Sequence, residues 1–347
     1  MALGGGVFVT QNKTLPGSYI NFVNASKASS NVGDRGTVAI AYALGKEAGT
    51  VIEITKSEFL KDSESILGVK ADDAKAVVFR EIFAHATKCI IYDIGSEGAK
   101  TVAEAMSALE PYEFNVLAAY TSTAEDVTAY VETIKTWRDN GKKCQAVVYN
   151  AVDPDHEGII NLVSTVADED ADAHALVAWL AGAEAGCALN RSCTNVIYDG
   201  EYTVVCNHTQ EQLVEFLENG KVALHLVYGE VRVLEDINSL VTTTAEKGDD
   251  FKSNQTIRVI DQIANDIAKL FNTKYLGRIP NNASGRSSLW ADIVAHHRQL
   301  EAINAIEYFD SGALTVAQGE SKKSVVVNDA ITVTNSMSQL YMTVVIQ

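Results

Sequence analysis

The apolar run at residues 340–346 (LYMTVVI) constrains this chain more than any other feature. It is rich in β-branched and aromatic residues and contains no Gly or Pro, so it predicts a strand. Almost every position is apolar, which indicates burial on both faces of a sheet. A strand of this kind left in solvent would promote aggregation. We therefore expect it to pair within a sheet, through Leu340, Tyr341, Met342, Val344 and Val345.

Residues 1–30 pose the same question at the other end of the sequence. The short run at residues 18–23 (SYINFV) lies between a Gly-rich stretch and a tract rich in Ser, Ala and Asn. This pattern predicts one strand between flexible linkers. Two isolated strands on flexible segments suggest strand exchange between subunits, with pairing inside one molecule as the alternative. The residues expected to pair in the first strand are Tyr19, Ile20, Phe22 and Val23.

Composition indicates a globular chain and narrows its partners. Hydrophobic residues make up 47% and charged residues 21% of the 347 residues, which is ordinary for a folded protein. No apolar run is long enough to cross a bilayer, and no signal peptide is evident at the start, so we expect no membrane insertion and folding in a cytoplasm. The net charge of −17 argues against nucleic-acid binding.

Strands and helices are expected to alternate through the middle of the chain. Alternation of this kind predicts a largely parallel sheet covered by helices, with right-handed crossovers. The expected strands are residues 89–94, 115–120, 144–149 and 159–166, and the expected helices are residues 99–109, 124–140 and 172–189. We expect a hairpin-like return at 195–205 and a short helix at 210–219.

The flanking regions have mixed patterns. Before the alternating region we expect strands at 36–44 and 50–55 and helices at 57–66 and 72–86. After it we expect helices at 256–271 and 287–305, followed by strands at 313–316 and 324–327. The fold class is thus α/β and α+β with several domains. The expected divisions are residues 1–30 (N-terminal arm), 31–87 (small mixed segment), 88–230 (central α/β domain), 231–333 (C-terminal domain) and 334–347 (C-terminal arm).

Candidate catalytic residues do not form a convincing active site. The turn from Gly95 to Thr101 follows a strand and precedes a helix, where phosphates can bind, but its spacing fits neither GxGxxG nor GxxxxGK[ST]. A nucleotide-binding α/β enzyme with its site at this turn is the alternative function. Asp93, His85, His174 and Ser96 lack a nucleophile elbow, and the acidic turn Asp153, Asp155, His156 and Glu157 lacks the rest of a calcium loop.

Metal sites are not predicted either. The odd number of cysteines and the absence of a CxxC pair argue against a disulfide framework or a zinc site, so we expect buried free thiols. His296 and His297 are adjacent on a helix, and successive helical side chains point about 100° apart. With Arg298 they form a weak basic patch. We therefore expect no catalytic, cofactor-binding or metal-binding residues.

Several short segments, in order along nearly the whole chain, resemble contractile tail sheath proteins of myophages and R-type bacteriocins. The resemblance is strongest to sheaths of phage-like particles in Gram-positive bacteria, including the clostridial bacteriocins called diffocins. The segments are residues 15–22 (LPGSYINF), 35–40 (RGTVAI), 178–183 (AWLAGA), 198–200 (YDG), 235–240 (EDINSL), 257–261 (IRVID), 275–279 (YLGRI) and 338–345 (SQLYMTVV).

This resemblance implies a structural virion protein rather than an enzyme. Sheath subunits stack as hexameric rings, forming a helical polymer around an inner tail tube, and contract to drive the tube through a target cell envelope. The implied partners are other copies of the chain, the tube protein, and baseplate and tail terminator proteins. The implied location is the bacterial cytoplasm during assembly and then a particle released by lysis. The central domain would have a non-catalytic subtilisin-like fold, and both arms would add strands to neighbouring subunits.

The same resemblance, which is densest after residue 231, suggests which part faces the tube. Positive groups gather in this part of an otherwise acidic chain. Exposed ion pairs contribute only about 0–1 kcal/mol each and are screened by salt, which suits a contact that forms during assembly and is released on contraction. The expected tube-facing residues are Arg286, His296, His297 and Arg298.

Overall fold

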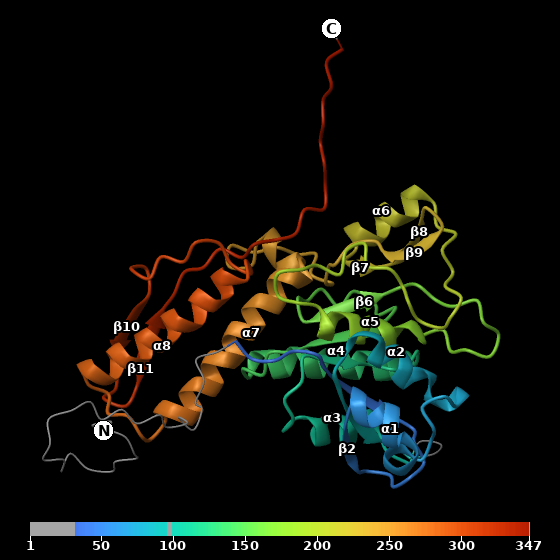
Figure 1. The fold of residues 1–347 in the computed structure, drawn as a ribbon, viewed down its shortest axis with the longest axis horizontal. Coiled ribbons are helices and arrows are strands. Elements are labelled where there is room, and N and C mark those ends of the chain that lie inside the picture. Colours follow the sequence, from blue (N-terminus) through green and yellow to red (C-terminus); the bar gives the residue numbers. More distant parts are fainter. Residues whose placement is uncertain (1–31, 96–98, 347) are drawn as a thin grey trace, which may run out of the picture.

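A seven-stranded sheet forms the centre of the broad lobe in the computed structural model, which describes residues 32–95 and 99–346 (Figure 1). Within these residues the strand order is β2-β3-β1-β4-β5-β6-β7. All neighbours are parallel except β2 and β3. The strands are β1 (Thr37–Tyr42), β2 (Val51–Thr55), β3 (Lys88–Asp93), β4 (Val116–Ala118), β5 (Gln145–Tyr149), β6 (Ile159–Leu162) and β7 (Lys221–Val222).

Helices cover both faces of this sheet, which explains why its strands are apolar throughout. Successive side chains of a strand point to opposite faces: Val38 and Ile40 of β1 pack into one core, and Ala39 and Ala41 into the other. The first core contains side chains of α1 (Lys56–Leu67), α2 (Val77–His85) and α5 (Leu176–Gly186). The second contains side chains of α3 (Val102–Leu109) and α4 (Ala124–Asp139).

Capping residues set where several helices begin. Thr55, Thr101 and Thr209 each accept a backbone N–H three residues on, and the acidic or amide side chain at that position bonds back to the threonine N–H. This capping box satisfies N–H groups that a helix start leaves unpaired. The third of these helices is α6 (Gln210–Glu218), which lies beside the hairpin of β8 (Leu224–Val227) and β9 (Glu230–Val233) (Figure 1).

Two long helices carry the chain away from the sheet to a narrower lobe. They are α7 (Asn254–Leu270) and α8 (Ala283–Ala302), connected through a π turn at Phe271–Tyr275. A third core lies here, with Leu289, Ile293 and Leu300 of α8 among its members. The hairpin of β10 (Thr315–Gln318) and β11 (Val325–Asn328) lies at the far end of this lobe (Figure 1).

The structure confirms the predicted alternation of strands and helices but not every element. The small unit expected at residues 31–87 shares one sheet with residues 88–230, because β1 lies between β3 and β4. The hairpin expected at 195–205 is absent from the described residues, and the chain there makes only isolated bridges such as Ile197 to Arg232. The 172–189 helix is shorter than expected, and β7 to β9 were not predicted. No described helix is long and apolar enough to cross a membrane.

Candidate functional site

The C-terminal arm exposes a run of apolar side chains to solvent. From Met337 onward its described residues extend away from the body without secondary structure (Figure 1). Its apolar side chains are 71–92% exposed across Leu340, Tyr341, Met342, Val344, Val345 and Ile346. A hydrogen bond of 2.8 Å from Tyr341 Oη to Gln339 Oε1 stays inside the arm. The burial predicted for this run is therefore not met within one described protomer.

The base of the arm, in contrast, is firmly attached. Gln255 of α7 donates from Nε2 to the Thr334 carbonyl (3.0 Å), and its Oε1 accepts the Ser336 amide (2.9 Å). The Thr334 amide donates to the Ala305 carbonyl. The chain is thus held up to Ser336 and released immediately after it. The exposed apolar run therefore starts from a fixed point on the body.

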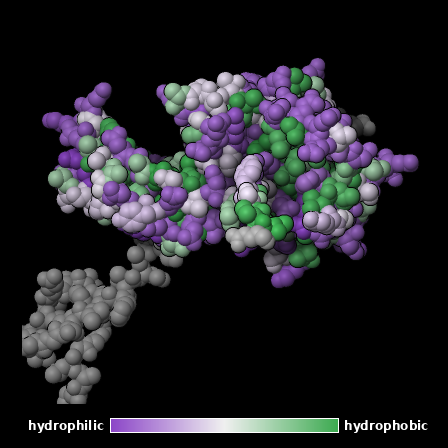
Figure 2. Space-filling view, turned by 90° about the horizontal axis from the view of Figure 1, so that it is seen from above, coloured by the Kyte–Doolittle hydropathy of each residue, from purple (hydrophilic) through white to green (hydrophobic). Residues whose placement is uncertain are grey.

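The β10–β11 hairpin offers a possible place for such a strand. Within residues 32–95 and 99–346 it is a two-stranded sheet without a third strand, and a two-stranded sheet is only marginally stable alone. Val326 and Val327 are 46% and 39% exposed. A mainly apolar hollow lies next to it, lined by Leu276, Ile279 and Val325 and also by the charged side chains of Arg286 and Lys323. Figure 2, which looks onto the molecule from above, shows further hydrophobic residues gathered over the broad lobe.

The four expected tube-facing residues do not share one surface. Arg286 is half-buried and donates to Asn281. Arg298 pairs with Glu301 at 2.5 Å and lies over the Tyr308 ring. Both residues are partly exposed, and both guanidinium groups have a partner within the chain.

His296 and His297, however, are 1% and 0% exposed. The prediction that they contact a partner is therefore wrong for this conformation: each ring is enclosed and bonded to a carboxylate, Asp266 or Asp329. A helix that packs against other segments on two sides can bury two adjacent residues. The sequence pattern of α8 did not indicate such packing.

A buried charged cluster joins α5 of the broad lobe to α7. Arg258 Nη2 lies 2.6 Å from Glu184 Oε2 and 3.1 Å from Asp236 Oδ2, and the three side chains are 0–2% exposed. Cys193 Sγ is 3.9 Å from the same nitrogen. Glu184, Cys193 and Asp236 are close enough to share a metal ion, but the guanidinium already occupies the point on which they converge. The cluster is therefore an internal ion pair rather than a metal site.

The two carboxyl groups of this cluster differ in protonation. Burial, assisted by the nearby Asp236 charge, raises the pKa of Glu184 well above its usual value. Burial also opposes ionisation of Asp236, but the Arg258 charge and hydrogen bonds from Glu184 and the Cys193 amide lower its pKa. Asp236 is thus the stronger acid of the two, while Glu184 ionises less readily than an exposed glutamate.

A second buried pair links α4 to α7. Arg138 donates two hydrogen bonds to Asp261, at 2.5 and 2.9 Å. Glu157, from the acidic turn, lies 3.8 Å from Arg138 and 2.8 Å from Lys247, while Asp155 accepts the backbone amides of Val241 and Thr242. Asp155 and Glu157 of this turn thus have partners within the chain. Sequence analysis did not identify these buried ion pairs. The signal that could have indicated them is the position of two charged residues, Arg258 and Asp261, among the apolar residues of one helix.

In the described part of the turn considered for nucleotide binding, the Gly95 amide is bonded to the Asp93 carboxylate. The Asp93 carboxylate accepts backbone amides of Gly45, Lys46, Glu47 and Gly95 at 2.8–3.3 Å. Burial raises the pKa of Asp93, but these N–H groups outweigh that effect and lower it. Three of these amides belong to the loop between β1 and β2 and one, that of Gly95, belongs to the turn, so Asp93 ties the start of the turn to that loop. Residues 96–98 lie outside the described residues.

The catalytic triad considered from sequence does not assemble among the described residues. His85 Nε2 is 3.1 Å from Asp199 Oδ1 rather than beside Asp93. His174 packs its ring edge-on against Tyr120. Ser96 lies outside the described residues. His85, His174 and Asp93 therefore contact different residues and do not form one site.

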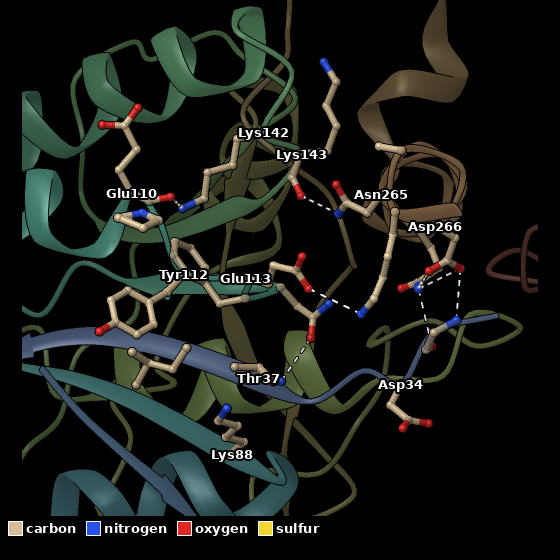
Figure 3. A pocket seen from close by; sticks show the side chains of 18 of the residues that line it. Asp34, Thr37, Lys88, Glu110, Tyr112, Glu113, Lys142, Lys143, Asn265 and Asp266 are labelled. Carbon is tan, nitrogen blue, oxygen red and sulfur yellow. Dashed lines mark hydrogen bonds and ion pairs between the residues drawn. The ribbon is translucent and has the colours of Figure 1, made fainter. Parts of the chain in front are cut away.

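A hollow of about 800 Å³ lies between α7 and the strands β1 and β3, with Thr37, Lys88 and Asn265 in its walls. Figure 3 shows its walls joined by side chains: Asn265 Nδ2 donates to the Lys143 carbonyl at 2.8 Å. Lys269 of α7 faces Glu113 at 3.6 Å, and both are largely exposed. Lys142 is folded onto the Phe114 and Trp137 rings. This is a polar groove between the lobes, with its charges mostly paired.

Comparison with known proteins decides the family. Residues 95–239 match the model of the phage tail sheath protein central domain, and residues 246–347 match that of the phage tail sheath C-terminal domain. The chain belongs to the phage tail sheath family. It is 26% identical over 302 residues to the tail sheath protein of Clostridium phage phiCD119, covering 82% of this chain and 83% of that one.

Other relatives define how far the similarity extends. The chain is 31% identical over 276 residues to the uncharacterized protein YqbK of Bacillus subtilis, and these cover 75% of this chain but only 59% of YqbK. A sheath tail protein from Desulfitobacterium hafniense has the same fold (TM-score 0.75, 23% identity, 92% of this chain and 100% of that one). So does the contracted helical sheath of the anti-feeding prophage (TM-score 0.70, 15% identity, 96% and 99%).

Proposed function

We propose that this sheath-family protein is a non-enzymatic structural subunit that polymerises in stacked hexameric rings around an inner tube. Contraction of this polymer would drive the tube through a target envelope. The observation that carries the proposal is the C-terminal arm, whose apolar strand-forming residues are exposed in the single protomer while its base is fixed. Such an arm is suited to pairing with another copy. The solved contracted sheath of the same fold supports the comparison.

The arm would add a strand to the β10–β11 hairpin of a neighbouring copy. Strand addition supplies main-chain hydrogen bonds, while pockets for alternate side chains give specificity. The apolar hollow beside β11 can accept side chains from one face of the added strand. Because this contact joins two different surfaces, it is heterologous and generates rings or helical polymers. The N-terminal strand residues Tyr19, Ile20, Phe22 and Val23 lie outside the described residues, and we propose the same role for them.

The C-terminal domain (residues 231–333) would face the tube. Arg286 and Arg298 are accessible there, and the loop after β10 adds Lys322 and Lys323. A surface of this sign fits an acidic partner, and many weak exposed pairs could be formed and broken together. The segments 31–87 and 88–230, which share one sheet, would form the outer body. Baseplate and tail terminator proteins would contact the two ends of the polymer. The particle would assemble in the bacterial cytoplasm and be released by lysis.

Electron microscopy of the purified full-length protein, with sedimentation at several concentrations, tests the proposed assembly. We expect tubular polymers in the megadalton range that form without nucleotide. A compact oligomer whose thermal stability rises with ATP would contradict the proposal, because a ligand that binds the native state stabilises it by mass action.

Cysteine cross-linking in trans tests the proposed strand pairing. One copy carries Val344→Cys, and a second, differently tagged copy carries Val326→Cys. We expect an intermolecular disulfide joining the two tags, formed only when both variants are mixed. Each single variant alone serves as the control for the five native thiols. If the cross-link instead forms within a copy that carries both substitutions, diluted with unmodified protein, the arm pairs with its own domain.

A further inference from the structure

Two adjacent histidines of α8 form a buried bridge between the segments that lead to the two arms. His296 Nε2 is 2.9 Å from Asp266 Oδ2, and His297 Nε2 is 2.7 Å from Asp329 Oδ2. The two Nδ1 atoms face each other at 3.2 Å. Both rings are almost completely buried. The four side chains therefore form a continuous row from α7 to the segment that follows β11.

The first carboxylate also holds the beginning of the described chain. Asp266 Oδ2 accepts the Gly33 amide at 3.0 Å, and both Asp266 oxygens accept from Gln262 Nε2. A Cβ on Gly33 would lie 2.6 Å from Asp266 Oδ1, so the backbone approaches more closely than a side chain would allow. A carboxylate that already accepts several N–H groups acts as an acceptor toward His296. The Nε2 atom of His296 therefore carries a proton.

The same argument applies at the other end of the row. Asp329 is 26% exposed and therefore partly hydrated, which favours an ionised carboxylate that accepts from His297 Nε2. A neutral imidazole with a proton on Nε2 has none on Nδ1. If both rings were neutral, two nitrogen lone pairs would face each other at 3.2 Å. One Nδ1 must donate for this contact to be a hydrogen bond.

We propose that a single extra proton, shared by the His296 and His297 Nδ1 atoms, latches the bases of both arms to α8. Asp266, the two imidazoles and Asp329 then form one chain of hydrogen bonds with two negative charges and one positive charge. The other charged groups nearby on α8 are Arg298 and Glu301, which pair with each other. From the segment before β1, the Arg35 guanidinium donates to Gln262 Oε1 at 3.4 Å, and Gln262 in turn donates to Asp266. From the loop before β10 the contact is the uncharged Phe309 ring, 4.8 Å from His297.

A metal ion would be the other way to satisfy two facing nitrogens. Zinc sites in proteins use four ligands, of which at least three come from the protein. Among residues 32–95 and 99–346, no group of three potential ligands includes either histidine. Neither histidine lines the four hollows around residues 33–272, 271–325, 122–154 and 60–72. A proton fits this enclosed site, whereas a hydrated ion does not.

One shared proton makes the latch sensitive to pH in both directions. Removal of the proton at high pH leaves two facing lone pairs. Addition of a second proton at low pH places two N–H groups against each other. Either change breaks the row of hydrogen bonds, so the bases of the arms are held best while one proton is shared. This inference depends on the described contacts of one protomer and not on the proposed sheath function.

Hydrogen–deuterium exchange of the full chain across a range of pH, corrected for intrinsic exchange rates, tests the latch. The reporters are peptides containing Gly33 and residues 329–336, with β5 as an internal reference for global unfolding. We expect protection of both reporters to fall at least tenfold on each side of a common optimum, as expected for loss of a charge-assisted hydrogen bond. The double variant His296→Gln/His297→Gln should show low protection without an optimum. Arg298→Gln, at the next position, is the matched control and should keep the wild-type profile.

Three results would overturn the proposal. They are protection of the two reporters that does not change with pH, different optima for the two reporters, and loss of protection when EDTA is added at constant pH, which would indicate a bound metal. If β5 itself loses protection in the double variant, that variant is unfolded. In that case the pH profile of the wild-type protein is compared with that of Asp329→Asn. The side-chain amide of this variant carries no negative charge, so its protection should no longer show an optimum with losses on both sides.

Discussion

Two regions differ from the usual arrangement of apolar residues inside and charged residues outside. One is the junction between α5 and α7, and the other is the C-terminal arm. At the junction, Arg258, Glu184 and Asp236 are charged or ionisable and almost completely buried. In the arm, Leu340 and Ile346 are apolar and 84% and 92% exposed. Burial of charge is costly unless each group is paired, and exposure of apolar strand residues invites association. The junction satisfies its polar groups inside one protomer, whereas the arm leaves its apolar groups for another molecule.

This contrast separates two roles for the same chain. Buried ion pairs hold the two lobes in one relative position, because any displacement of α7 would separate charges that have no water to replace their partners. The arm contributes almost nothing to the core of its own protomer. Substitutions at the junction should therefore change folding stability, and substitutions in the arm should change association alone.

The largest loss of stability is expected for Arg258→Met. It leaves Asp236 ionised in the core without its partner, and removal of one member of a buried pair costs about 3–5 kcal/mol. The free energy of unfolding, measured with urea, should fall by this amount. Arg298→Met is the matched control, because its ion pair with Glu301 is partly exposed and contributes less than about 1 kcal/mol. Equal losses in the two variants would contradict the distinction between buried and exposed pairs.

The second prediction compares Asp236→Asn with Glu184→Gln. Asp236 is ionised, so its replacement removes the charge facing Arg258 and should cost about 3 kcal/mol. Burial raises the pKa of Glu184 and favours its neutral form, so an amide of similar shape should cost less than about 1 kcal/mol. Urea titrations at neutral pH measure both. A larger loss for Glu184→Gln would reverse the assignment of the proton.

The same assignment gives the sign of a pH effect. Burial raises the pKa of Glu184 in the folded chain well above the value of about 4.5 that it has when unfolded. The folded state therefore binds a proton that the unfolded state has lost. The stability contributed by this group is complete below the unfolded pKa and falls as pH rises toward the folded pKa, by about 1.4 kcal/mol per pH unit. The variant Glu184→Gln should lack this fall of stability with rising pH. Urea unfolding of both proteins at several pH values measures the difference.

Sequence reasoning reached the elements of the broad lobe because local patterns specify them. Apolar runs such as residues 144–149 predicted buried parallel strands, and the capping box at Thr101 marks a helix start. The place of β1 between β3 and β4 could not be predicted in this way, because it depends on pairing between distant segments. The burial of His296 and His297 was missed for a related reason: their partners, Asp266 and Asp329, lie about 30 residues away in opposite directions.

A smaller effect on stability is expected for the double variant Arg286→Glu/Arg298→Glu. Both guanidinium groups are at the protein surface, so the free energy of unfolding should change by less than about 1 kcal/mol. Charge reversal should nevertheless weaken assembly on the tube and alter its dependence on salt. Co-sedimentation with purified tubes measures this effect. Normal sheath-covered tubes from the variant would assign these residues to another surface.

The smallest effect on stability, with complete loss of assembly, is expected when residues 337–347 are deleted. The cut follows Ser336, the last residue of the arm held by Gln255. Sedimentation and urea unfolding of the truncated and full-length proteins, measured side by side, test whether the arm serves another molecule. We expect the truncated protein to be a folded monomer whose free energy of unfolding is within about 0.5 kcal/mol of the full-length value. Loss of several kcal/mol on truncation, or tubular polymers formed without the arm, would contradict this role.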